Sequence, residues 1–255
     1  MAATNDLLAG FELHSPRAIR EALAGGVSPT SPIGGKRPID RLIAMYTRST
    51  RFAECLRLML DAGASLDDPL LEAVLLDDDV RLRQVLDSSP RILERQLRLD
   101  CACTSMSGVS PLHVCAEYNC LKCARTLLAA GIDVNVRAET DSDGIGGQTP
   151  LFHAVNSNHN HCRDVMELLV EAGADLDVRL QGLVWGAGFE WETVVFDVTP
   201  ISYAQCGLYA QFHRRDEDVY SNLAYLYKSR YGSEMPVRNV PNKYLLDARV
   251  FPPKT

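Results

Sequence analysis

Apolar residues recur along much of the chain at three- and four-residue steps, a spacing that predicts amphipathic helices. In the stretch "CLKCARTLLAAG", Leu121, Ala124, Leu127 and Leu128 fall on one helical face. Gly131 follows them and is placed to end that helix in a left-handed cap. A shorter helix, "LHVCAEY", comes just before. The pattern therefore predicts a pair of helices joined by a turn.

The opening of this helix pair has relatives elsewhere in the chain. The related segments are "SPLHVCA" from Ser110, "TPLFHAV" from Thr149, "TPISYAQ" from Thr199, "RPIDRLI" from Arg37 and "DPLLEAV" from Asp68. Thr, Ser or Asp before Pro is a helix N-cap with proline in the first helical position. Second signatures follow, namely "AGGVSPT" from Ala24, "DAGASLDD" from Asp61, "AAGIDVNV" from Ala129 and "EAGADLDV" from Glu171. The chain is therefore built from repeated helix pairs.

These segments resemble the ankyrin repeat. Residues 110–136 fit the family pattern without gaps, and residues 149–178 fit it with three extra residues in the turn that contains His159 and His161. Weaker copies begin at Asn5, Arg37, Asp68 and Thr199, which gives six units with the first and last as caps. The resemblance implies an all-α solenoid of stacked helix-turn-helix units. It also implies that Leu112 and Leu151 are buried equivalents.

Two parts of the chain are expected, the ankyrin-repeat domain in residues 1–232 and an extended C-terminal tail in residues 233–255. The tail contains four prolines and shows no helical period. It either straps along the repeats or extends freely. We favour the strap, because its apolar residues would otherwise face water. Those residues are Tyr244, Leu245, Leu246 and Phe251.

Three insertions interrupt the repeats. Residues 90–109 are long enough to hold an extra helical turn at about 92–97. Residues 137–147 are acidic and rich in glycine, which predicts a mobile tip. Residues 179–198 contain both tryptophans, and their strand-forming segments "LVW" and "FEWETVVF" flank "GAG". This third insertion is predicted to form a β-hairpin.

The aromatic residues of this hairpin are the candidate partner-binding site: Trp185, Phe189 and Trp191. If "FEWET" is a strand, Phe189, Trp191 and Thr193 share one face. In ankyrin proteins such hairpins project like fingers beside the concave face, which is the usual partner surface. The alternative is that these aromatic side chains fold back and cover the edge of the repeats, since an isolated two-stranded hairpin is only marginally stable.

Composition narrows the range of functions. The chain has 255 residues, of which 46% are hydrophobic and 23% charged, as in an ordinary globular protein. A net charge of -7 disfavours binding to nucleic acid or to anionic membranes. No apolar run approaches the roughly 20 residues that span a bilayer. The opening "MAATNDLLAGFELHSP" is unlike a secretory signal, so we expect a cytoplasmic protein with its eight cysteines reduced.

The cysteines and histidines are the candidate chemical sites of the chain. Cys120 and Cys123 are spaced like a metal-binding pair, but they belong to a repeat helix, and Cys101 and Cys103 are too close together for a standard zinc site. His113 matches the family's threonine-proline-leucine-histidine step, where the resemblance implies a structural hydrogen bond. The acidic run Asp77–Asp79 is expected to be a solvated turn. No metal, cofactor or catalytic residue is predicted.

The sequence therefore predicts a non-enzymatic module that binds a partner protein through its concave face and inter-repeat loops. The alternative, from another functional class, is a redox- or metal-responsive regulator that uses the cysteine-rich region 101–123.

Overall fold

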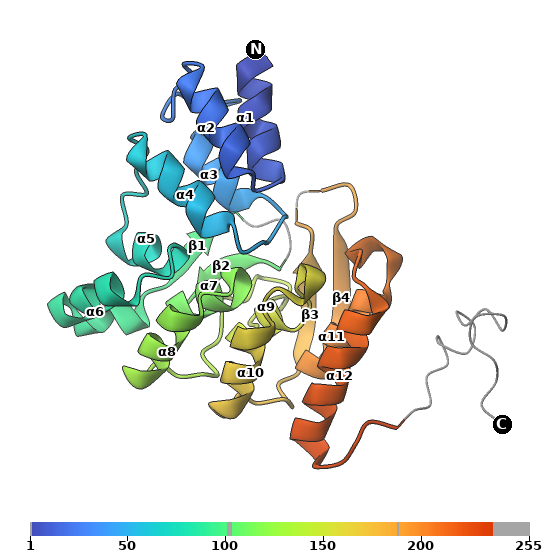
Figure 1. The fold of residues 1–255 in the computed structure, drawn as a ribbon. Helices are drawn as coiled ribbons and strands as arrows, with labels where there is room; N and C mark the ends of the chain where they lie inside the picture. The colour runs from blue at the N-terminus through green and yellow to red at the C-terminus, as the bar shows by residue number, and fades with distance from the viewer. Residues whose placement is uncertain (1, 101–103, 188, 237–255) are drawn as a thin grey trace.

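The computed structural model describes residues 2–100, 104–187 and 189–236, and twelve α-helices lie in these ranges. The helices follow one another in six consecutive pairs, which Figure 1 shows from the N-terminus to α12. They are α1 (Ala2–Glu12), α2 (Pro16–Ala24), α3 (Pro38–Ala44), α4 (Phe52–Asp61), α5 (Pro69–Leu75), α6 (Asp79–Ser88), α7 (Pro111–Tyr118), α8 (Leu121–Ala129), α9 (Pro150–Ala154), α10 (Arg163–Glu171), α11 (Pro200–Gln205) and α12 (Asp216–Tyr231).

The first helix of most pairs begins at a proline. Helices α3, α5, α7, α9 and α11 all have proline at their start, as the repeated openings predict. Proline loses nothing there, because the first amide of a helix has no intrahelical partner. The preceding residue often supplies a cap: the carboxylate of Asp68 accepts hydrogen bonds from the amides of Leu70 and Leu71.

The second helices of the two strongest repeats end at glycine. Gly131 after α8 and Gly173 after α10 have φ angles of 91° and 90°, in the left-handed region where residues with a side chain are strained. The predicted left-handed cap at Gly131 is therefore confirmed. The third pair ends differently, because Ser89 has an extended backbone and a short 3-10 helix follows it.

The helices pack in two rows around one apolar core. Helices α5, α7, α9 and α11 contact one another in that order, as do α6, α8, α10 and α12. Leu112 at the start of α7 and Leu151 at the start of α9 have no exposed surface, which confirms them as buried equivalents. The core continues through the N-terminal helices as well, from Leu7 in α1 to Leu226 in α12.

Two antiparallel strand pairs lie between the helix pairs. Strand β1 (Leu97–Leu99) pairs with β2 (Met106–Val109), and β3 (Leu180–Trp185) pairs with β4 (Thr193–Val198). The helical turn expected at 92–97 is only partly right, because the 3-10 helix η1 (Pro90–Glu94) stops before β1 begins. Leu97 and Leu99 are buried while Arg98 is exposed, the alternation that a strand requires.

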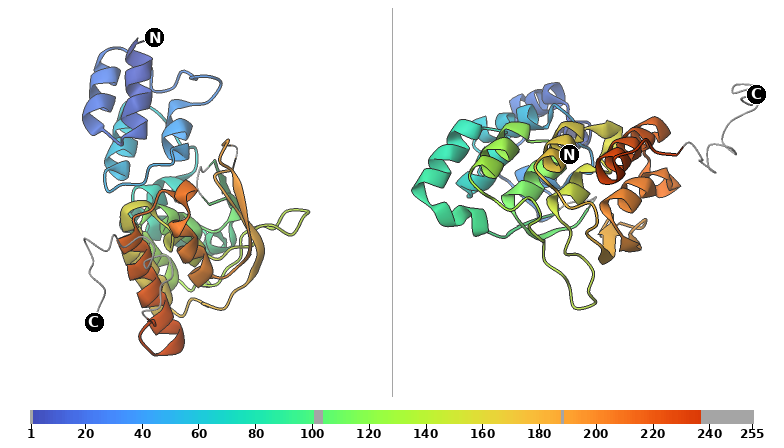
Figure 2. Two further views of the ribbon diagram at one scale, coloured as in Figure 1. Left: turned by 90° about the vertical axis from the view of Figure 1, so that its right-hand side faces the viewer. Right: turned by 90° about the horizontal axis from the view of Figure 1, so that it is seen from below.

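The loop at 137–147 forms a turn that is attached to β3. At its base the Ala138 amide donates to the Gln148 carbonyl oxygen at 2.9 Å, and the Gly147 amide donates to Glu139 at 3.0 Å. The Gly146 amide donates to the Gly182 carbonyl oxygen at 2.9 Å. Figure 2 shows this loop, between α8 and α9, projecting beyond the rest of the chain. Its mobility, expected from the sequence, remains a prediction.

Further 3-10 turns are η2 (Asn158–Asn160), η3 (Cys206–Leu208) and η4 (Ala210–Phe212). The first of these occupies the long turn between α9 and α10 that contains His159. The predicted tail contacts through Tyr244, Leu245, Leu246 and Phe251 lie outside the described residues, as do Cys101 and Cys103. None of the described helices combines the length and the apolar character needed to cross a bilayer.

Candidate functional site

The hairpin of β3, its connecting turn and β4, called the finger from here on, has one face turned toward the helices. Leu183 and Trp185 point inward from β3, and Trp185 is only 3% exposed. Its indole stacks on the ring of Phe212 with centroids 4.4 Å apart, and the Arg214 guanidinium lies 4.9 Å from the indole centroid. Its position along β3 therefore places Trp185, one of the three predicted partner-binding residues, on the inner face of the finger.

The other two predicted residues lie at the tip of the finger. Phe189 and Trp191 belong to the turn, since β4 begins only at Thr193, so the strand proposed for "FEWET" is wrong for its first four residues. Their rings stack on each other with centroids 4.8 Å apart. Phe189 is 44% exposed and Trp191 is 36% exposed. These two residues, the aromatic tip, are accessible to a partner.

The aromatic tip is connected to the core through Trp185. The rings of Trp191 and Trp185 have centroids 6.4 Å apart, and Trp185 in turn stacks on the buried Phe212. Trp191 also covers Gly186, where a Cβ would overlap the indole and where φ is +71°. Only glycine fits a site that is both left-handed and covered by a ring. The tip is thus held by the packing of the finger and does not hang free in solvent.

The outer face of the finger is apolar as well, a feature that the sequence reading missed. Gly182 is covered by Ile145, Val194 and Phe196, whose atoms lie 2.6 to 3.4 Å from where a Cβ would be. Phe196 is 67% exposed. Together with Val184 these side chains form the outer apolar cluster. The solvent face of an antiparallel pair is usually polar, and the alternation of Val194 and Phe196 was the available sequence signal.

A groove of about 530 Å³ opens beside the aromatic tip. Phe189 and Ala187 form one side, and Lys36 and Ala44 of the N-terminal pairs form another. The floor comes from the β1–β2 pair. Lys36 forms an ion pair with Asp100 across it. The groove thus combines apolar surface with charges of both signs, which suits a protein ligand better than a nucleic acid.

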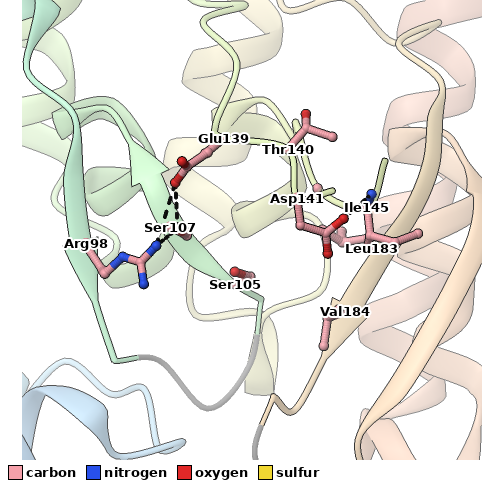
Figure 3. Close-up of a pocket in the computed structure, with 10 residues that line it drawn as sticks. Arg98, Ser105, Ser107, Glu139, Thr140, Asp141, Ile145, Leu183 and Val184 are labelled. Carbon is pink, nitrogen blue, oxygen red and sulfur yellow. Dashed lines mark hydrogen bonds and ion pairs between the residues drawn. The ribbon is translucent and has the colours of Figure 1, made fainter. Parts of the chain in front are cut away.

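A second, smaller pocket of about 210 Å³ lies between β1, β2, β3 and the 137–147 loop, and Figure 3 shows its lining. Arg98 donates to the Ser107 hydroxyl at 2.7 Å, and that hydroxyl donates to Glu139 at 2.9 Å. The Asp141 carboxylate accepts from the Ile145 amide at 2.9 Å. These polar groups have partners within the pocket, so they stabilise the loop against the strands.

A buried polar cluster joins three helix pairs. The Arg48 guanidinium lies 3.0 Å from the Glu117 carboxylate, whose other oxygen lies 3.0 Å from Nδ1 of His153. All three side chains are almost fully buried. Arg48 comes from the long turn between α3 and α4, while the other two come from α7 and α9. The turn between α3 and α4 is thus packed against α7 and α9 through Arg48.

The histidines of the helix ends serve structural roles. Nδ1 of His113 accepts from the Ser110 amide at 3.1 Å, so Nε2 carries the proton and donates to the Gln148 carbonyl oxygen at 3.0 Å. This is the hydrogen bond that the resemblance implies. Burial lowers the pKa of His113 to about 3, and burial together with Arg48 lowers the pKa of His14 to about 4. Both rings are therefore neutral near pH 7.

The acidic run at the start of α6 is also structural. Asp78 accepts from the Arg81 amide at 3.0 Å and so caps the helix, as the sequence suggested. Asp77 accepts from the Cys123 amide of the next pair at 2.9 Å, a contact that a solvated turn would not make. One of these acids thus ties neighbouring repeats together.

The described cysteines are free thiols in buried positions. Burial raises the pKa of every one of them, for example to about 11 for Cys55 and about 12 for Cys162, so these thiols stay protonated at neutral pH. Metal binding and thiol exchange both need the thiolate. Within the described ranges no group of three or more metal-ligating side chains comes together. The alternative function as a redox or metal regulator gains no support.

Comparison with known proteins identifies the repeats. The family model for ankyrin repeats matches residues 88–180 in three copies. No curated protein gives a significant match to the chain. The matched residues contain the helix pairs α7–α8 and α9–α10, which are the two copies that the sequence pattern marks as strongest. Residues 88–180 therefore carry ankyrin repeats, which are generally protein-interaction modules.

Proposed function

We propose that this chain is a non-enzymatic adaptor that recognises a partner protein through the aromatic tip of its finger and the groove beside it. The observation that supports this most is the exposed, stacked pair Phe189 and Trp191 on a hairpin that is anchored through Trp185. Large aromatic side chains contribute a disproportionate share of the energy at protein interfaces.

Anchoring makes the tip well suited to binding. A contact held in place before binding loses less conformational entropy when the complex forms. The groove next to Phe189 adds apolar surface and the Lys36–Asp100 ion pair, which could orient a partner through complementary charges. The helix face beside α7 and α9 contributes less in this proposal, because the buried ion pair of Arg48 and Glu117 occupies it.

Two broader features belong to the same proposal. The six helix pairs would form one ankyrin array over residues 1–232, with α1–α2 and α11–α12 as its caps. The protonated, buried thiols suit a reducing compartment, and we infer a cytoplasmic location.

Site-specific photocrosslinking tests the proposed interface. Phe189 is replaced by the photoreactive analogue p-benzoylphenylalanine, the variant is irradiated in extracts of its native cells, and covalent adducts are identified. We expect a discrete adduct with one partner protein, because the ring at this position would lie inside the interface.

The control places the same analogue at Tyr231, which is more exposed than Phe189 (57% against 44%) and lies at the far end of α12. Equal labelling from both positions, or adducts that persist when Trp191 is changed to Ala, would count against the proposal.

A further inference from the structure

The free edge of β4 can be located from one hydrogen bond. Gly182 is paired opposite Phe196, yet its carbonyl oxygen accepts from the Gly146 amide at 2.9 Å, on the side away from β4. In an antiparallel ladder the backbone groups of one residue point to the same side, and facing residues alternate between bonded and non-bonded pairs. Gly182 and Phe196 are therefore a non-bonded pair. The amide and carbonyl of Phe196 point away from β3.

The same alternation applies two residues earlier. Val194 is paired opposite Val184, so its backbone groups also face the outer edge. In the described parts of the chain, neither Val194 nor Phe196 has a backbone partner on that edge. Their side chains are exposed members of the outer apolar cluster. An exposed apolar edge of this kind is a template for another strand, unless the fold protects it.

A channel runs along this edge. It has a volume of about 430 Å³ and lies between β4 and the segment formed by α11, η3 and η4. Its apolar lining includes Val195, Leu208 and the exposed Tyr209. One residue of a strand occupies roughly 160 Å³, from a rise of about 3.4 Å, a strand spacing of about 4.8 Å and a layer spacing of about 10 Å. The channel therefore has room for about three residues of one added strand.

The charges of the channel define what would fit it. Asp197 and Asp216 are the two carboxylates that line it. Asp197 already forms a two-bond ion pair with Arg179, whereas Asp216 is exposed at the start of α12. A basic side chain beside Asp216 would be favourable. The opposite wall of the channel is formed by residues such as Gln205 and Leu208.

We propose that the edge of β4 binds an extended segment of a partner protein by strand addition. The segment has apolar residues at alternating positions and a Lys or Arg at the end next to Asp216. Its backbone pairs with Val194 and Phe196, and its side chains contact the outer apolar cluster on one face and the channel on the other. This surface is distinct from the aromatic tip, so it adds a second contact to the function proposed above.

A labelled synthetic peptide tests the proposal without knowledge of the natural partner. The probe is fluorescein-KTVYVTVT, measured by fluorescence anisotropy against the full chain. We expect saturable binding. A peptide N-methylated at alternate residues should bind about tenfold more weakly or worse, because it cannot complete the ladder. This comparison needs no protein variant and so does not depend on how a variant folds.

Variants then locate the site. Phe196→Pro removes one outward-facing amide and should lower the affinity for the probe by about tenfold. Asp216→Lys should also lower this affinity. Trp191→Ala should leave probe binding unchanged, which separates this proposal from the function of the aromatic tip. Absence of saturable binding, or equal binding of the N-methylated peptide, overturns the proposal.

Two other occupants would also overturn it. Concentration-dependent dimerisation in sedimentation velocity that Phe196→Pro abolishes would assign the edge to a second copy of the chain. Probe binding that occurs only after deletion of residues 237–255 would assign it to the chain's own C-terminal segment.

Discussion

Trp185 and Trp191 belong to the same hairpin and their rings are 6.4 Å apart, yet they lie in opposite environments. Trp185 is packed between Phe212 and the Arg214 guanidinium, while more than a third of Trp191 faces solvent. The first is part of the core that supports the finger, and the second is part of the surface that the finger presents. The aromatic residues concentrated in this one insertion thus have two roles, to support the finger and to form its exposed surface.

The difference between the two tryptophans comes from strand geometry and from distant residues. Trp185 ends β3 on the inward side, where Phe212 from a segment after α11 meets it. Trp191 lies in the turn, where alternation no longer applies and the ring rests on Gly186. A binding site on a loop is usually positioned by a rigid scaffold, and here Trp185 connects the two.

The largest effect is expected for Trp185→Ala. Loss of a buried indole removes its contacts with Phe212 and the Arg214 guanidinium and leaves a cavity, which costs about 3–5 kcal/mol of unfolding free energy. Chemical denaturation followed by circular dichroism measures it. Trp185→Phe is the matched variant and should recover a large part of the loss. A change below about 1 kcal/mol for Trp185→Ala would show that the finger does not depend on this anchor.

A second contrast between buried and exposed rings concerns the histidines. It predicts that the stability of the folded chain depends on pH. The pKa of His14 in the folded chain, about 4, lies below its ordinary value of 6.5, so protonation favours the unfolded state. The stabilisation is complete above about pH 6.5 and is lost as the pH falls toward 4. We expect His14 to contribute a loss of about 3 kcal/mol between pH 7 and pH 4.

Comparison of variants isolates this contribution from the titration of carboxylates. The difference in unfolding free energy between the wild type and His14→Gln should change by about 3 kcal/mol across that range. A difference that stays constant with pH for His14→Gln would contradict the assignment of a buried neutral ring.

The helical framework could be predicted because its signals are local. A proline such as Pro111 or Pro150 marks where a helix begins, and a glycine such as Gly131 marks where its partner ends. Spacing of the leucines between them fixes the buried face. Each of these signals acts within one or two helical turns, so a single sequence contains it in full.

Features that depend on distant contacts could not be predicted in this way. Arg48 is 69 positions from Glu117, and nothing in either neighbourhood indicates that the two would meet. The inward orientation of Trp185 likewise required the position of Phe212. The β1–β2 pair was missed because its strands are short and their alternation spans only three or four residues.

The claim that the aromatic tip binds a partner is tested most directly by measuring the stability and the partner affinity of Trp191→Ala together. The partner recovered by crosslinking at position 189 is purified, and its dissociation constant is compared for the wild type, Trp191→Ala and Tyr231→Ala. We predict that Trp191→Ala changes the unfolding free energy by less than about 1 kcal/mol and weakens binding by about tenfold or more, with Tyr231→Ala unchanged in affinity. A loss of several kcal/mol in stability with partner affinity intact would instead show that the aromatic tip is structural.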